Sequence, residues 1–169
     1  MIGAHLTIGT GDGIADAPQP PGDALDLGLD GQVQHGLNLY LPLKSPALMP
    51  ALAAAIGALK EKRIFPALAS LDYVHFARFL PAPDSSALWV ITTYDGPLES
   101  YIMDFVGVVG DVFTELLQFI YGAPPLPVAQ YPREFVDFVV SHNVMQGGDV
   151  WSAYRDMTVL DIKRQGAWT

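Results

Sequence analysis

The segments YVHFARFL (73–80), PAPDSS (81–86) and ALWVITTY (87–94) decide the fold of this chain. The two outer segments are rich in β-branched and aromatic residues, and the Pro, Asp and Ser residues between them favour a turn. They therefore predict a β-hairpin. Asp95-Gly96-Pro97 follows and predicts the start of a helix that runs to about Tyr121, because proline is favoured at the first helical position.

The chain before the hairpin predicts a strand and then a helix. From Val33 to Leu43 every second residue is apolar or histidine, so the strand should have one apolar side. Ser45-Pro46 could cap and open a helix whose regular part begins nearer Pro50. This helix is Ala-rich through residue 59 and ends with Lys60, Lys62 and Arg63, cations that favour a helix C-terminus.

The helix predicted over 97–121 has one narrow polar stripe, and its remaining surface is apolar. One sheet face cannot hide so much apolar surface, so another helix or another subunit must cover part of it. Pro132 opens a shorter helix that ends near Asn143, and residues 152–162 are predicted as a last strand. This order of elements predicts an α+β fold of the ferredoxin-like split βαβ type, a four-stranded antiparallel sheet with helices on one face.

Composition limits the domain count and the partners. At 169 residues the chain suits one domain, predicted over 31–169, preceded by an arm over 1–30 that is rich in Gly, Pro and Asp and has no Lys or Arg. The formal net charge of −9 argues against a nucleic-acid partner. Half of the residues are apolar and 16% are charged, which predicts a buried interface in a homodimer or larger assembly.

The sequence also bounds chemistry and location. It has no cysteine, so disulfides and thiolate sites are excluded. No apolar run reaches about 18 residues and the N-terminus lacks the basic flank of a secretory signal, so no membrane span and a cytoplasmic location are expected. No hydrolase triad, HExxH motif or phosphate-binding loop is present.

A sheet with helices on one face leaves its other face bare. Several aromatic residues fall on the predicted strands, among them Tyr40, Trp89 and Tyr154. Two such faces that meet in a homodimer would enclose a barrel-like cavity for a ligand of modest size. The alternative is that these aromatic residues only pack a core.

The motifs HFAR (75–78), YDG (94–96), ESY (99–101) and DF (104–105) resemble a pattern in a largely uncharacterised bacterial family of the dimeric α+β barrel superfamily. That superfamily also contains dye-decolorising peroxidases, chlorite dismutases and small cofactor-independent monooxygenases. The resemblance covers about 35 residues and implies the fold and dimerisation more strongly than an activity. The Gly-rich acidic motif of the peroxidases is absent.

Three residues are candidates for catalysis: His75, Arg78 and His142. His75 and Arg78 lie three apart on a strand, so they should point to opposite faces unless a bulge intervenes. Arg78 is interpreted as the partner of Asp95 or Glu99 in an ion pair, with a substrate-anion contact as the alternative. His75 is interpreted as a hydrogen-bonded core histidine, with proton transfer as the alternative.

His142 shares a helix face with two aromatic residues. It could serve as an axial haem ligand or a general base, or it could simply stabilise a helix C-terminus. Asp95 is interpreted as a helix cap. The acidic stripe that contains Asp104, Asp111 and Glu115 is interpreted as a solvated surface, so no metal site is predicted.

The resulting hypothesis is that a cavity beside the helix-free sheet face binds a small hydrophobic or aromatic molecule. If the protein is an enzyme, this hypothesis makes it an oxidoreductase that resembles a peroxidase or a monooxygenase. The remaining candidates for the lining, in addition to the three above, are Asn38, Tyr40, Trp89, Thr93 and Tyr154. The alternative is a non-catalytic protein that uses these surfaces only for self-association.

Overall fold

Three antiparallel strands form the sheet in the computed structural model, which describes residues 32–144 and 150–166. They are β1 (Gln34–Pro42), β2 (Val74–Pro81) and β3 (Ala87–Asp95). Their order is β1-β3-β2, so β3 lies at the centre. The hairpin predicted from 73–94 is confirmed, and so is the strand predicted from Val33. The predicted arm over 1–30 lies outside the described residues.

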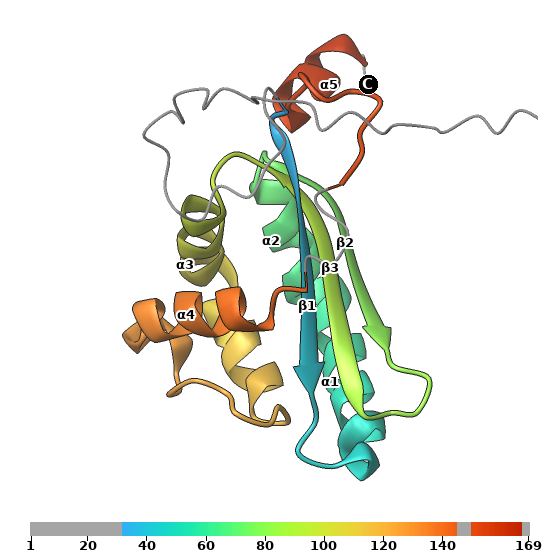
Figure 1. Cartoon of the computed structure of the whole chain (residues 1–169), viewed down its shortest axis with the longest axis vertical. Coiled ribbons are helices and arrows are strands. Elements are labelled where there is room, and N and C mark those ends of the chain that lie inside the picture. The colour runs from blue at the N-terminus through green and yellow to red at the C-terminus, as the bar shows by residue number, and fades with distance from the viewer. Residues whose placement is uncertain (1–31, 145–149, 167–169) are drawn as a thin grey trace, which may run out of the picture.

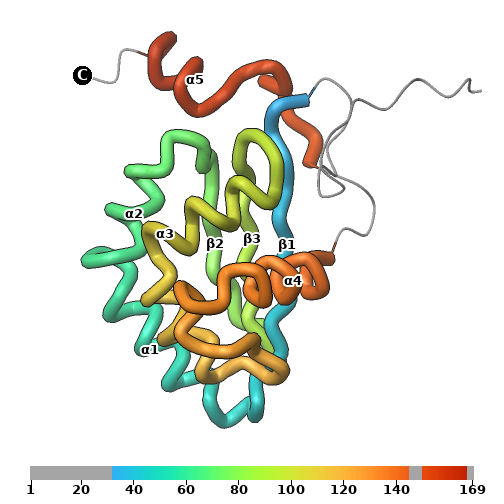
Figure 2. Tube along the Cα trace, turned by 90° about the vertical axis from the view of Figure 1, so that its left-hand side faces the viewer, coloured from blue at the N-terminus to red at the C-terminus, as the bar shows by residue number. Residues whose placement is uncertain are grey.

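Helices cover one face of the sheet (Figures 1 and 2). The longer segments are α1 (Met49–Leu59), α2 (Phe65–Ser70), α3 (Leu98–Leu117), α4 (Pro132–His142) and α5 (Val159–Gln165). Two short 3-10 turns, η1 (Pro46–Leu48) and η3 (Val128–Gln130), precede α1 and α4, and one π-helical turn, η2 (Lys60–Ile64), joins α1 to α2. α3 and α4 lie in front of the sheet in Figure 2.

The first helical stretch continues past its predicted end at residues 60–63 and reaches Ser70. Pro66 has no N–H, so it cannot bond to the carbonyl four residues earlier. The N–H of Phe65 instead bonds to the Lys60 carbonyl, five residues back, and the chain continues as α2. The helical chain therefore passes Pro66 through a π turn, which shifts the hydrogen-bond register by one residue.

The core lies between the sheet and the helices. The alternate residues Leu37, Leu39 and Leu41 of β1 are each 3% exposed, as the period-two pattern predicts. α4 packs against α3, with the rings of Phe113 and Phe135 5.4 Å apart. Another helix of the same chain therefore covers part of the apolar surface of α3.

The predicted fourth strand at 152–162 is wrong. Its first half forms turns, and α5 begins at Val159. Thr158 and Asp161 form a capping box, in which each side chain accepts a hydrogen bond from the other residue's backbone N–H. This Thr-x-x-Asp spacing starts a helix inside a segment whose apolar and polar residues alternate as they do in a strand.

Residues 143–144 lie beside β1, at the edge away from β3. Asn143 bridges to Leu39, and the Val144 N–H donates to the Asn38 carbonyl at 2.8 Å. The Asn38 N–H in turn donates to the Asn143 side-chain oxygen at 3.0 Å. This single bridge ties the chain after α4 to that edge of the sheet.

Candidate functional site

The helix-free face of the sheet consists of alternate residues from the three strands, paired across the sheet in rows. The rows are Gly36–Thr93–Phe76, Asn38–Ile91–Arg78 and Tyr40–Trp89–Leu80. The strand residues between them point to the helices, since Leu37, Val90 and Ala77 line the core. Five predicted site residues, Asn38, Tyr40, Arg78, Trp89 and Thr93, therefore share this helix-free face.

Aromatic and aliphatic side chains form most of this face. Tyr40 and Trp89 meet edge to face with ring centroids 5.0 Å apart. Phe76 is 71% exposed, so covering its ring with another molecule would be favourable. The face thus offers a broad apolar surface for contact with another molecule.

His75 joins the same side through a β-bulge. Val74 pairs with Tyr94, but Phe76 pairs with Thr93, so His75 is the extra residue in β2. Its Nε2 lies 2.7 Å from Oδ1 of Asp95, and the two side chains are 6% and 9% exposed. Asp95 follows Ile91 and Thr93 on the helix-free side of β3. His75 is therefore hydrogen-bonded as interpreted, but it is not in the core.

Asp95 does not have the capping role that its sequence context suggests. The N-cap of α3 is Pro97, with no side-chain hydrogen bond, and Oδ2 of Asp95 accepts from the Val159 N–H of α5 at 2.7 Å. The predicted ion pair of Arg78 with Asp95 or Glu99 is also wrong. The Asp95 carboxylate is occupied by His75 and α5, and among residues 32–144 and 150–166 no ion pair to Arg78 is present.

The C-terminal segment forms a polar wall at one end of the helix-free face. The Gln34 side-chain amide, on the same side as Asn38, donates to the carbonyls of Tyr154 at 3.0 Å and Met157 at 2.7 Å. Gln34 is consequently only 5% exposed. Figure 1 shows this segment and α5 at the upper end of the strands.

Tyr154 belongs to this polar wall rather than to a strand. Its backbone carbonyl contacts Gln34, whereas its side chain is 63% exposed. Neighbouring contacts reinforce the wall, because the Gln32 side chain donates to the Val150 carbonyl at 2.8 Å. Sequence reasoning missed Gln32, Gln34 and Asp95, although the position of Gln34 on the polar side of its strand placed it on this face.

His142 lies apart from the other candidates, at the end of α4 on the helical side of the sheet (Figure 2). Its Nδ1 is 2.8 Å from the Phe138 carbonyl, which can only accept, so Nδ1 carries the proton. The open groove beside it also contains Glu134 and Asp137 and has no basic residue. These carboxylates would repel haem propionates, so the groove does not fit haem.

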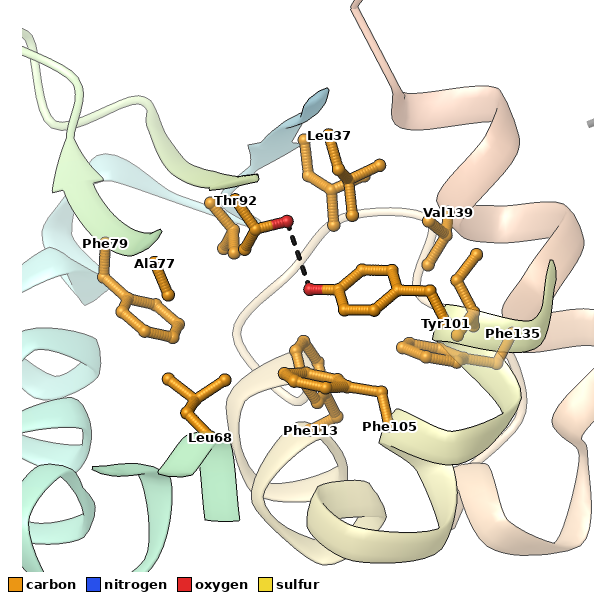
Figure 3. A pocket seen from close by; sticks show the side chains of 13 residues that line it. Leu37, Leu68, Ala77, Phe79, Thr92, Tyr101, Phe105, Phe113, Phe135 and Val139 are labelled. Carbon is orange, nitrogen blue, oxygen red and sulfur yellow. Dashed lines mark hydrogen bonds between the residues drawn. The ribbon is translucent and has the colours of Figure 1, made fainter. Parts of the chain in front are cut away.

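A small cavity lies in the core between the sheet and α3, shown in Figure 3. Its volume is about 20 Å³, room for about one water molecule. Its lining is apolar apart from Thr92 and Tyr101, which share a hydrogen bond of 3.1 Å. This cavity is too small for a ligand, and it lies on the wrong side of the sheet for the predicted cavity.

Tyrosines of the core carry perturbed hydroxyls. Burial raises the pKa of Tyr101 to about 12, and its ring stacks on Tyr94 at 4.1 Å. Burial and the nearby Asp104 carboxylate also raise the pKa of Tyr73, whose hydroxyl has no hydrogen-bond partner within the described part of the chain. Both hydroxyls therefore stay protonated in neutral solution.

The described residues contain no group of three His, Asp or Glu side chains placed to hold a metal ion. In the acidic stripe of α3, Asp111 forms an ion pair with Arg63 of η2. Within the same described ranges, no helix combines the length and the apolar character needed to cross a membrane.

Comparison of the chain with protein-family models, curated proteins and solved structures gives no match.

Proposed function

We propose that the protein binds a small hydrophobic or aromatic molecule against the helix-free face of the sheet. The observation that carries this proposal is the convergence of one exposed aromatic side chain, two half-buried ones and a few polar groups on that face. Tyr40, Phe76 and Trp89 supply flat apolar contacts, and Arg78 and Thr93 supply polar ones. Ligand sites commonly combine an apolar lining with a small number of polar groups that orient the ligand.

For this site, one chain supplies only the sheet face and the polar C-terminal segment at one end of it. A second copy that packs its own helix-free face against the first would close it. Such a pair corresponds to the dimeric α+β barrel that the sequence motifs resemble, and the strand order β1-β3-β2 is compatible with the ferredoxin-like arrangement. The homodimer is therefore part of the proposal.

Catalysis of an oxidation is a narrower version of the same proposal. Its support is the resemblance of HFAR (75–78) and YDG (94–96) to a superfamily that contains oxidoreductases. The second candidate function is self-association without a ligand. It is favoured by the half-buried and exposed apolar side chains of the helix-free face, which a second copy alone could cover.

Native mass spectrometry of the purified protein tests binding. The expected result is a dimer whose mass exceeds that of two chains by a small molecule, which is released on denaturation. Ile91→Asp should remove the extra mass, because it places a carboxylate at the centre of the apolar face. The matched control is Val108→Asp, which changes an exposed residue of α3 that is 44% exposed.

A wild-type dimer that carries no additional mass and binds no apolar aromatic probe, such as naphthalene, would favour self-association alone. A monomer would contradict the closed cavity.

A further inference from the structure

We infer that Asp95 holds His75 as a hydrogen-bond acceptor at the edge of the helix-free face, and that with Arg78 this pair selects a hydroxyl-bearing aromatic carboxylic acid. This inference rests on the proposed function and specifies its ligand class. Nδ1 of His75 accepts a hydrogen bond from the hydroxyl, and the guanidinium of Arg78 binds the carboxylate.

The geometry fixes the tautomer of His75. A carboxylate is an acceptor only, and both oxygens of Asp95 are used, Oδ1 at 2.7 Å from Nε2 of His75 and Oδ2 at 2.7 Å from the Val159 N–H. Nε2 therefore carries the hydrogen. In the neutral imidazole, Nδ1 is left with a lone pair that can accept a hydrogen bond or a proton.

That lone pair has no partner in the described residues. His75 makes one hydrogen bond there, through Nε2, and its side chain is 6% exposed. Nδ1 itself is not fully buried, since within residues 32–144 and 150–166 the Tyr73 hydroxyl is the fully buried side-chain N or O atom that lacks a partner. This nearly buried nitrogen can therefore accept a hydrogen bond from a donor group of a ligand.

The neighbours of His75 define the rest of the ligand. Its ring lies against Phe76, with centroids 6.5 Å apart, and Phe76 is the exposed aromatic residue next to it on the helix-free face. Arg78 lies two residues further along β2, ~7 Å away along the strand, and is exposed. One benzene ring over Phe76 could therefore present a hydroxyl to His75 and a carboxylate to Arg78.

Arg78 has the character of an anion site. Its nearest neighbours on this face are the apolar residues Ile91, Phe76 and Leu80, and no carboxylate of the described residues pairs with it. A planar guanidinium binds a carboxylate through two parallel hydrogen bonds, which are stronger than neutral ones. Closure of the face by a second copy would strengthen this contact by excluding water.

The experiment compares three probes by NMR titration of the full chain: 4-hydroxybenzoate, benzoate, which lacks the hydroxyl, and phenol, which lacks the carboxylate. We expect 4-hydroxybenzoate to bind about tenfold more tightly than either, the usual effect of one hydrogen bond to a buried or charged group. Arg78→Met should abolish the advantage over phenol and keep the advantage over benzoate. Arg133→Met, on α4, is the matched control and should change neither ratio.

The imidazole nitrogens give a readout that does not depend on a variant's folding. In the wild type, the ¹⁵N resonance of Nδ1 should move with 4-hydroxybenzoate and stay in place with benzoate. Asp95→Asn should reverse the tautomer, because its amide NH₂ would donate to Nε2 while its oxygen keeps the Val159 N–H. The preference for 4-hydroxybenzoate over benzoate should then disappear.

Equal affinities for the three probes, with an unmoved Nδ1 resonance, would overturn this inference and leave the proposed function intact. If naphthalene and all three probes fail to bind, the proposed function falls with it.

Discussion

At the scale of single residues, two glycines of α3 give opposite predictions for the same substitution. A Cβ added at Gly107 would meet nothing within 4 Å, so Gly107→Ala should stabilise the protein by about 1 kcal/mol through helix propensity. A Cβ at Gly110 would lie 3.3 Å from Cγ2 of Val128, whose side chain is fully buried. Overpacking costs about 1–3 kcal/mol, so Gly110→Ala should be destabilising by about 1 kcal/mol net.

Urea unfolding of both variants measures this difference. The two substitutions are chemically identical and lie one turn apart, so each controls for the other. Equal stabilisation by both would show that η3, which contains Val128, can shift away from the added methyl group without loss of stability. η3 would then not be packed tightly on α3.

The site residues show what sequence spacing can predict at this scale. Alternation along a strand correctly grouped Tyr40, Trp89 and Thr93 on one face, because side chains in a strand alternate without regard to tertiary context. His75 could not be assigned, since a single bulge reverses the parity of a strand. The role of Asp95 was missed because its partner Val159 lies 64 residues away in the sequence.

At the scale of elements, the capping box of α5 is the feature that replaces the predicted strand. The hydroxyl of Thr158 and the N–H of the same residue donate to Oδ2 of Asp161 at 2.7 Å and 3.1 Å. Thr158→Ala should therefore destabilise α5 by about 1 kcal/mol. Hydrogen exchange of the Ile162 amide, which donates to the Thr158 carbonyl, measures this loss locally.

The same cap should make α5 sensitive to acid. Hydrogen bonds from Thr158 lower the pKa of Asp161 below its ordinary value of 3.8. A carboxyl with a lowered pKa in the folded state adds stability above its unfolded pKa, and this stability is lost as the pH falls through the folded pKa. The Ile162 amide should be better protected from hydrogen exchange in wild type than in Asp161→Asn. This difference in protection should be largest at pH 7 and should shrink below pH 3.8. A difference that does not depend on pH would contradict the capping role.

Element prediction succeeded where the local signals agreed and failed where two patterns competed. The hairpin and α3 have consistent strand, turn and helix signals, and both form within a few residues of the predicted bounds. Residues 152–162 carry strand-like alternation together with a Thr-x-x-Asp helix start, and the helix start prevails from Val159. Without its own partner strand, this segment instead contacts Gln34 through backbone carbonyls.

At the scale of the whole molecule, self-association through the helix-free face is the prediction on which the proposed site depends. Phe76→Lys should place a cation on this face in the row next to Arg78 and oppose a second copy by charge repulsion and desolvation. Tyr121→Lys is the matched control, because Tyr121 is an aromatic side chain outside that face and is 69% exposed, against 71% for Phe76. Both substitutions alter an exposed residue, so the stability of the single chain should change by less than about 0.5 kcal/mol in either case. Light scattering coupled to size-exclusion chromatography should then give a dimer for wild type and Tyr121→Lys and a monomer for Phe76→Lys. If Phe76→Lys remains a dimer, the subunits associate through another surface, and the aromatic residues of the helix-free face stay open to solvent.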